Sequence, residues 1–180
     1  MTGDILETLI LVDDNDNQIG TASREECHKG KGKRHRAFSV FLFDSRDRML
    51  LQFRSSEKLG GNRWDSAAIS HVRAGETYET AAERNMKHEI GISTPVKKIG
   101  AFTYTEPYNG YSENEYCAVL VGKFDGEVKP NKEEMDRVRY ATWDEVKREL
   151  KTKPEAFTKW FRNSIPILEK FIKEFGFLKN

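Results

Sequence analysis

The apolar residues of this chain fall into short segments separated by turn-forming residues, and this spacing constrains the fold more than any other feature. Residues 37–43 and 49–53 flank a polar turn at 44–47, which is typical of a β-hairpin. Residues 8–12 precede a cluster of Asp and Asn and indicate an earlier hairpin. Further strands are predicted at 64–71, 96–104, 115–124 and 138–142. We therefore expect a sheet to form most of the core.

One central segment has the period of a helix instead of a strand. Within residues 77–90, large or apolar residues recur every four positions, at Tyr78, Ala82, Met86 and Ile90. Glu83 can pair with Lys87 one turn later, and Gly91 is a typical helix end. These residues predict an amphipathic helix between two groups of strands.

The C-terminal part of the chain is predicted to be helical. A short helix should run from residue 143 to about 150. After Pro154, aromatic and aliphatic residues mark a longer helical segment over 154–176, which Pro166 should kink or divide. Strands, one central helix, more strands and terminal helices together give an α+β fold. A single domain over the 180 residues, 1–180, can bury roughly 70% of the unfolded chain's surface.

The composition argues against several classes of protein. The longest apolar runs are strand-sized, whereas a membrane span needs roughly 20 residues. Residues 1–7 have no basic residue and no apolar stretch, unlike a signal peptide, and two cysteines are too few for a disulfide scaffold. A net charge of +1 lacks the basic excess of a nucleic-acid binder. We therefore expect a cytoplasmic protein with no membrane or nucleic-acid partner, either a monomer or a weak dimer.

A basic segment at 29–36 is the main exception to this neutral balance. It contains two glycines and six Lys, Arg or His residues. Its spacing does not match the P-loop, in which four residues separate the glycines and a Lys-Ser/Thr pair follows. We interpret the segment as a solvated loop.

The region around the central helix contains a specific spacing of charged residues. Glu76 is followed after seven residues by Arg84, and then by Glu89. This pattern resembles the Nudix box, G-x5-E-x7-R-E-U-x-E-E-x-G-U, where U is a bulky aliphatic residue and the carboxylates hold Mg²⁺ against a diphosphate. Six positions fit the box: Glu76, Arg84, Met86, Glu89, Gly91 and Ile92. Three do not, because a glycine and two glutamates are replaced by Ser70, Asn85 and His88.

Segments outside the box narrow the resemblance to one family. They are Cys27-His28, the run HRAFSVFLF at 35–43, residues 50–55, Ser70-His71 and the Glu-Asn-Glu triplet at 113–115. Over residues 12–160 the chain resembles type 1 isopentenyl-diphosphate isomerase, whose members also keep only the box glutamate that matches Glu89. The resemblance implies a Nudix-type α/β/α sandwich with a mixed sheet, extra N-terminal strands and C-terminal helices. It also implies a small-molecule diphosphate substrate and the conversion of isopentenyl to dimethylallyl diphosphate.

The same resemblance implies a metal site. Its ligands would be His28, His35, His71, Glu113 and Glu115, which include three of the chain's four histidines. Glu113 and Glu115 are two apart in a predicted strand, so they should project from the same face. Three imidazoles favour zinc or a transition metal such as manganese over magnesium, and all three ions are candidates. A second ion, Mg²⁺, would lie between Glu89, a backbone carbonyl near Ile69 and the diphosphate.

The resemblance also assigns residues to substrate binding. Candidate neighbours of the diphosphate are Arg24, Arg54, Lys58 and Ile69, of which the three cations would neutralise phosphate oxygens. Tyr104 would assist acid–base chemistry, and the π face of Trp160 would stabilise a developing carbocation. Trp160 equally fits the buried face of an amphipathic helix.

One departure from the family affects the chemistry directly. Alkene isomerisation adds a proton to one carbon and removes one from a carbon two atoms away, so it needs two acid–base groups. In the family these are a glutamate, matched by Glu115, and a cysteine two residues before His71, where this chain has Ile69. Isoleucine cannot transfer a proton, and the hydroxyl of Ser70 is a far weaker acid or base than a thiol. Cys117 shares the predicted strand face of Glu115, so a relocated thiol is an alternative.

Three functions remain open from the sequence. The first is a metal-dependent isomerase of isopentenyl diphosphate with slow or altered proton transfer. The second is a Nudix hydrolase of nucleoside or isoprenoid diphosphates, in which Glu76, Glu89 and the His/Glu metal supply charge neutralisation and an activated water. The third is a non-catalytic module that binds a diphosphate.

Overall fold

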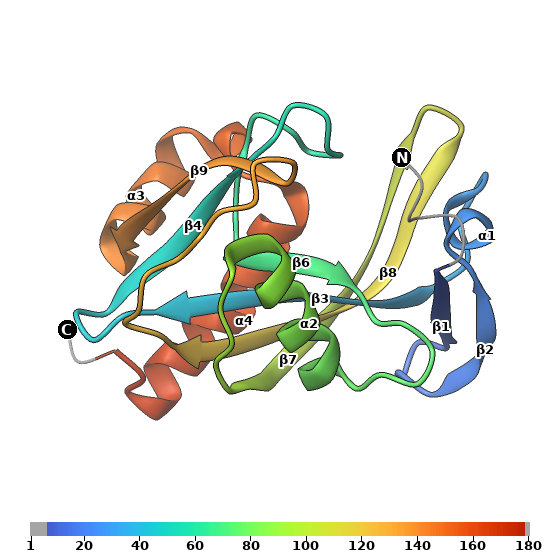
Figure 1. Ribbon diagram of the computed structural model, residues 1–180, viewed down its shortest axis with the longest axis horizontal. Helices are drawn as coiled ribbons and strands as arrows, with labels where there is room; N and C mark the ends of the chain where they lie inside the picture. Colours follow the sequence, from blue (N-terminus) through green and yellow to red (C-terminus); the bar gives the residue numbers. More distant parts are fainter. Residues whose placement is uncertain (1–6, 179–180) are drawn as a thin grey trace.

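Nine strands form one mixed sheet within residues 7–178, which the computed structural model describes (Figure 1). The central strand is β3 (His35–Phe43), which pairs in parallel with β8 (Tyr111–Lys123) and antiparallel with β6 (Ala68–His71). The other strands are β1 (Thr8–Val12), β2 (Gln18–Ser23), β4 (Arg48–Arg54), β5 (Trp64–Asp65), β7 (Val96–Tyr108) and β9 (Met135–Thr142). β1 pairs with β2 and β7 with β8 as antiparallel hairpins, while β9 pairs with β4.

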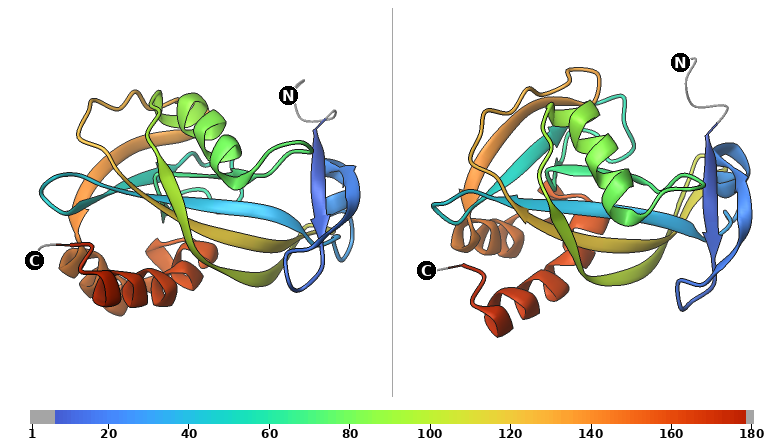
Figure 2. Two further views of the ribbon diagram at one scale, coloured as in Figure 1. Left: turned by 90° about the horizontal axis from the view of Figure 1, so that it is seen from below. Right: turned by 60° about the horizontal axis from the view of Figure 1, so that its bottom comes forward.

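Helices cover both faces of this sheet (Figure 2). They are α1 (Arg24–His28), α2 (Tyr78–Ile90), α3 (Trp143–Thr152) and α4 (Lys159–Phe175), with a short 3-10 turn, η1 (Pro154–Ala156). α2 lies on one face, and α3 and α4 lie on the other (Figure 2). None of the helices in the described part of the chain is long and apolar enough to cross a membrane.

Two apolar cores separate the three layers. On β3, Phe38 and Val40 belong to the core that includes residues of α2, while Phe41 and Phe43 belong to the core that includes residues of α3 and α4. Because β3 is buried on both faces, its residues 37–43 are apolar apart from Ser39 and do not alternate with polar ones. The arrangement confirms the expected α+β sandwich with a mixed sheet and terminal helices.

The central helix forms where the sequence predicts it. The hydroxyl of Thr77 accepts a hydrogen bond from the backbone N–H of Thr80 at 3.2 Å, which caps the first turn. Gly91 ends the helix with a φ of +68°, a left-handed conformation that glycine adopts without strain. The predicted ion pair is present, with 2.7 Å between Lys87 Nζ and Glu83 Oε1.

The predicted strand at 64–71 is instead two short strands. β5 pairs with β4, whereas β6 pairs with β3, so the chain changes partner at Ser66 and Ala67. The Ser66 hydroxyl donates to the backbone carbonyl of Ala68 at 3.3 Å. The sequence of residues 64–71 does not reveal this change of partner, because no turn signal separates the two short strands.

Pro166 was predicted to kink or divide the C-terminal helix, and it does not divide it. α4 continues through this residue from Lys159 to Phe175. Proline removes one helical N–H, but Phe161, Leu168 and Phe171 are buried against the sheet on either side of it. Packing of this apolar face holds the helix together despite the missing hydrogen bond.

The short helix α1 was not predicted, although its start has a recognisable signal. Ser23 Oγ accepts from the backbone N–H of Glu26, and Glu26 Oε2 accepts from the backbone N–H of Ser23 at 3.1 Å. This is the capping box, in which Glu follows Ser by three residues. The helix places His28 at its last position.

The basic loop after α1 is attached to the β7–β8 hairpin. The N–H of Gly30 donates to the Gly110 carbonyl at 3.1 Å, and the Ser112 hydroxyl donates to the Gly30 carbonyl at 2.8 Å. A Cβ on Gly32 would lie 3.0 Å from the backbone oxygens of Cys27 and Ser112, so this position requires glycine. These contacts hold the end of α1 against β8.

Candidate metal centre and active site

Four buried side chains from distant parts of the chain converge at one end of the sheet. His28 ends α1, His35 begins β3, His71 ends β6 and Glu113 lies in β8. One potential ligand atom of each lies within 4.8 Å of those of the other three. Glu115 adjoins them, because its Oε1 lies 3.1 Å from His71 Nε2 and 3.9 Å from His35 Nε2. All five predicted metal ligands are therefore brought together.

Strand pairing explains this convergence. His35 is directly opposite Glu115 in the parallel β3–β8 pair, and the neighbouring Ala37 is opposite His71 in β6. Glu113 is two residues before Glu115, so both project from the same face. The register of three adjacent strands thus brings His35, His71 and the two glutamates together, and α1 adds His28.

Two of the imidazole rings, those of His28 and His35, are oriented by hydrogen bonds to backbone carbonyls outside the cluster. His28 Nδ1 lies 2.6 Å from the carbonyl oxygen of Arg24, and His35 Nδ1 lies 2.8 Å from that of Lys33. A ring nitrogen can bond a carbonyl only by donating, so in each ring Nδ1 carries the hydrogen and Nε2 faces the cluster. Metal-binding histidines commonly have this arrangement.

Two atoms at the centre have no hydrogen-bond partner among the described residues. They are Nε2 of His35 and Oε2 of Glu115, and both are buried. Buried polar atoms are nearly always paired, so these two require a ligand. Imidazole nitrogens with carboxylate oxygens suit zinc or another divalent transition metal. The residues therefore fit a divalent cation.

Burial and mutual charge control the protonation of this cluster. Burial, helped by the charge of His71, lowers the pKa of His35 to about 3, so its ring is neutral. Burial also lowers the pKa of His71, but the carboxylates of Glu113 and Glu115, 3.8 and 3.1 Å from its Nε2, outweigh this effect and raise the pKa to about 9. Burial and the charge of Glu113 raise the pKa of Glu115. Without a metal, protonated His71 supplies positive charge to the two carboxylates.

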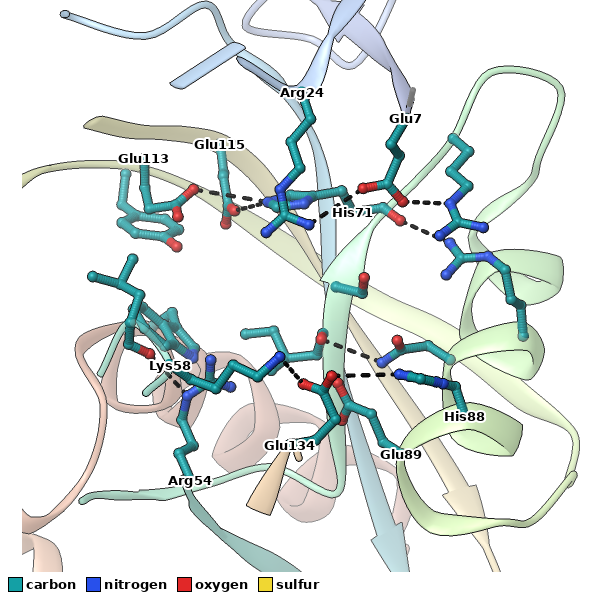
Figure 3. Close-up of a pocket in the computed structure, with 18 residues that line it drawn as sticks. Glu7, Arg24, Arg54, Lys58, His71, His88, Glu89, Glu113, Glu115 and Glu134 are labelled. Atoms are coloured by element: carbon teal, nitrogen blue, oxygen red, sulfur yellow. Dashed lines mark hydrogen bonds and ion pairs between the residues drawn. The ribbon is translucent and has the colours of Figure 1, made fainter. Parts of the chain in front are cut away.

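The cluster forms one end of a pocket of about 430 Å³ (Figure 3). Figure 3 shows His71, Glu113 and Glu115 at this end and Glu89 and Glu134 at the other. Every residue predicted to bind substrate also lines the pocket: Arg24, Arg54, Lys58, Ile69, Tyr104 and Trp160. The wall also contains residues that were not predicted, including Glu7 and Leu59.

Glu89 lies near the end of α2 and is held by an amide side chain. Its Oε2 accepts from Gln52 Nε2 at 3.1 Å. Asn85, one turn earlier on α2, donates through Nδ2 to the backbone carbonyl of Ile69 at 3.2 Å. Amide side chains therefore bind both groups that were predicted to hold a second ion. Burial raises the pKa of Glu89 to about 7.

Glu134, a pocket residue next to Glu89, was not predicted. It precedes β9, and its Oε2 lies 2.7 Å from Lys58 Nζ while its Oε1 lies 3.4 Å from His88 Nε2. No pattern marks it in the sequence, because it belongs to a polar loop far from the box. It adds a carboxylate to the end of the pocket where two box glutamates are missing.

The three predicted phosphate-binding cations contact acidic side chains. Arg24 Nη1 lies 3.3 Å from Glu7, and Arg54 Nη1 lies 3.5 Å from Asp65. Lys58 pairs with a carboxylate at a still shorter distance, as described above. A bound diphosphate would therefore compete with these carboxylates for the cations.

Ile69, Tyr104 and Trp160 form the apolar part of the pocket. The Tyr104 ring centroid lies 6.3 Å from that of Trp160, and burial together with the charge of nearby Glu115 raises the pKa of Tyr104. Cys117, the alternative thiol, is fully buried in the apolar cluster behind them, and this burial raises its pKa well above the ordinary value. It does not line the pocket. The geometry thus argues against Cys117 as the replacement for the missing cysteine.

The box residue Glu76 has a local structural role. Its two oxygens accept from Arg84 at 2.6 and 2.9 Å, and one of them also accepts from the backbone N–H of Arg73 at 2.9 Å. Arg84 in turn donates to the His71 carbonyl at 3.1 Å. Glu76 therefore secures the loop that leads into α2, which leaves it poorly placed to hold a metal.

The fold and the site together define the class of protein. The family model of the NUDIX domain matches residues 33–161. A solved structure from Deinococcus radiodurans superposes with a TM-score of 0.65 at 21% identity, covering 82% of this chain and 90% of that one. A MutT protein from Methanosarcina mazei gives a TM-score of 0.63 at 17% identity, with coverage of 81% and 96%. These likenesses show that the chain has the fold of a NUDIX-domain protein.

Curated relatives identify the branch of this class. A Photorhabdus laumondii protein named isopentenyl-diphosphate Delta-isomerase 2 is 36% identical over 161 residues, which are 88% of this chain and 90% of the relative. The isopentenyl-diphosphate Delta-isomerase of Serratia proteamaculans is 38% identical over 86% of this chain and 87% of its own length. The chain therefore belongs to the isopentenyl-diphosphate Delta-isomerase family.

Proposed function

We propose that this protein is a single-domain, metal-dependent enzyme that interconverts isopentenyl diphosphate and dimethylallyl diphosphate. This proposal rests on one observation: three histidines and two glutamates lie together beside a pocket whose wall also contains basic and aromatic residues. The names of the curated relatives support the same activity. The proposal includes zinc, manganese or magnesium at the His/Glu cluster, and Mg²⁺ with the diphosphate.

The reaction moves a double bond by one position. A proton adds to the terminal CH₂ carbon of the substrate, which leaves positive charge on the branched carbon. The adjacent methylene then loses a proton, and its C–H electron pair forms the new double bond. Atoms and electrons balance, because one proton enters and one leaves.

The chain's own residues can perform half of this proton transfer. Glu115 and Tyr104 both line the pocket, and a carboxylate and a phenol can each carry a proton there. The π face of Trp160 attracts the developing cation, and Arg54 and Lys58 neutralise the diphosphate. A divalent cation, when bound, neutralises the acidic wall and fixes the positions of its carboxylates.

The pocket has no effective second acid–base group among the described residues at the position where the family resemblance predicts one. Ile69 lines the pocket where the family has a thiol, and neighbouring Ser70 also lines it. Neither an alkyl group nor an alcohol exchanges protons readily near neutral pH. We therefore expect isomerisation to be slow.

The test is to incubate the protein with isopentenyl diphosphate, Mg²⁺ and either Mn²⁺ or Zn²⁺, and to measure both dimethylallyl diphosphate and released phosphate. Allylic product above the no-enzyme control, reduced at least ~100-fold in Glu115→Gln, is the expected result. Glu106→Gln is the matched control, because Glu106 pairs with Lys159 and lies opposite Glu113 on β7. Absence of allylic product under all metal conditions would refute the proposal.

A Nudix hydrolase of nucleoside or isoprenoid diphosphates is the second candidate. It is favoured by Ile69 in place of a proton-transferring thiol and by the two carboxylates, Glu89 and Glu134, at one end of the pocket. A hydrolase would release phosphate without forming allylic product, and Glu89→Gln would abolish this release. A panel of nucleotides would then be tested as substrates. Binding without turnover of either substrate class would indicate a non-catalytic module.

A further inference from the structure

A second buried carboxylate lies directly behind the pocket, in β5. Asp65 is completely buried and does not line the pocket itself. Its Oδ2 accepts from Trp160 Nε1 at 2.6 Å, and its Oδ1 accepts from the backbone N–H of Ser66 at 2.8 Å. Arg54 Nη1 lies 3.5 Å from the same Oδ2.

All of these neighbours present hydrogens to Asp65. An indole N–H, a backbone N–H and a guanidinium can only donate, so the side chain at this position must accept from several directions at once. An ionised carboxylate does this, because both of its oxygens are acceptors. An amide of the same shape does not, because its NH₂ group would face another donor. The site is therefore built for a charged aspartate even though burial opposes the charge.

Asp65 connects two pocket residues that come from different elements. Trp160 lies in the first turn of α4, and Arg54 is the last residue of β4. The Arg54 guanidinium also lies over the Trp160 ring, 5.4 Å from a centroid, and its Nε donates to the Leu59 carbonyl at 2.9 Å. Arg54 thus has two anchors, whereas the indole N–H of Trp160 has Asp65 alone as its hydrogen-bond acceptor among the described contacts.

The loop after β4 packs against the same ring. A Cβ on Gly60 would lie 2.8 Å from Trp160 Cη2, so the backbone approaches the ring edge as closely as glycine permits. The ring is therefore held at its edge by the loop and at its nitrogen by Asp65. Only its remaining surface can face the pocket.

We propose that Asp65 is a positioning residue that fixes the Trp160 indole relative to Arg54, so that the ring faces the hydrocarbon part of a substrate whose diphosphate is held by Arg54. This rests on the proposed function for the roles of Trp160 and Arg54. The hydrogen-bonded carboxylate also polarises the indole toward greater electron density, which strengthens its attraction for a cation. Asp65 itself contacts no reacting atom.

The test compares Asp65→Asn in the wild-type and Trp160→Phe backgrounds. In the wild-type background we expect kcat to fall about tenfold or more, because a charge-assisted hydrogen bond is lost, while KM changes little because Arg54 keeps its bond to Leu59. In the Trp160→Phe background the same substitution should cause no further loss of kcat. Asp44→Asn is the control, since Asp44 is a buried carboxylate at the distant β3–β4 turn that accepts two backbone N–H bonds.

A spectroscopic measurement separates this proposal from the proposed function. The emission of Trp160 is obtained by subtracting the spectrum of each protein's Trp160→Phe counterpart. This emission should differ between wild type and Asp65→Asn, and so should its change on adding magnesium pyrophosphate. If the wild type does not turn over isopentenyl diphosphate, the proposed function fails, but these spectra still decide the role of Asp65. Unchanged Trp160 emission, or a loss of kcat that persists undiminished in the Trp160→Phe background, would overturn the proposal. Asp65→Thr, which keeps one acceptor, replaces Asp65→Asn in every arm if the amide variant does not fold.

Discussion

Replacing Glu89 by Gln should stabilise the protein at neutral and alkaline pH. Glu89 is 5% exposed, and burial raises its pKa from 4.5 to about 7. A carboxyl whose pKa rises on folding stabilises the folded state fully below its unfolded pKa, and that stability is lost as the pH rises through its folded pKa. The difference between 4.5 and about 7, at roughly 1.36 kcal/mol per pKa unit, is about 3 kcal/mol of unfolding free energy.

A glutamine at position 89 does not ionise and should escape this loss. The two proteins should have similar unfolding free energies at about pH 4.5, and the variant should be more stable by up to ~3 kcal/mol at about pH 8. The amide oxygen of the new side chain can still accept the hydrogen bond from Gln52. Urea unfolding followed by circular dichroism, in the presence of a chelator, measures the difference at each pH.

Glu83→Gln is the matched control, because Glu83 is exposed on the same helix and pairs with Lys87. Its effect should be far smaller than that of Glu89→Gln, because an exposed ion pair is screened by water. A difference between Glu89→Gln and wild type that is the same at about pH 4.5 and about pH 8 would refute the reasoning, since a buried charge must act through titration. Adding Mg²⁺ with pyrophosphate should stabilise the wild type more than the variant, because a ligand stabilises only the form that binds it.

Three further outcomes follow from the site. His35→Ala should weaken Zn²⁺ or Mn²⁺ binding, measured by calorimetry, at least about tenfold. His88→Ala, which lies outside the cluster, should leave this binding unchanged. Equal effects of the two substitutions would mean that the cluster is not the metal site. Ile69→Cys should increase isomerase turnover at least ~100-fold over Ile69→Ser, because only the thiol is an effective acid–base group; no increase would show that the pocket has changed elsewhere as well. Arg54→Lys should weaken pyrophosphate binding by about tenfold in fluorescence titrations. The reason is that lysine cannot keep the forked contacts to the Leu59 carbonyl and Asp65. Unchanged affinity would contradict the arrangement described.

The parts of the fold that were predictable are those specified by local pattern. α2 formed over the expected residues because its four-residue period, its cap and its terminal glycine all indicate the same helix. The strands followed from short apolar runs between turn residues. The change of partner between β5 and β6 and the continuity of α4 through Pro166 were not predictable, because both depend on what lies beside the segment.

The candidate site shows the same division. His28, His35, His71, Glu113 and Glu115 could be proposed from the sequence because they stand at family positions, and the structure brings them together. Glu134 and the carboxylate of Asp65 carry no such mark, and Asn85 was marked only as a departure from the box. Each became relevant only through a neighbour distant in the chain: Lys58 for Glu134, Ile69 for Asn85 and Trp160 for Asp65.

The sequence by itself determined the class of secondary structure, the family and the presence of Ile69 two residues before His71, because these depend on residue identity and local spacing. Only the tertiary structure decided that Cys117 lies behind the pocket wall, that Glu76 is used by Arg84 and that Gln52 holds Glu89. The physical reason is that strand register and helix packing set distances between residues far apart in the chain. Those distances decide which acids are paired, which are buried without a partner and which can meet a substrate.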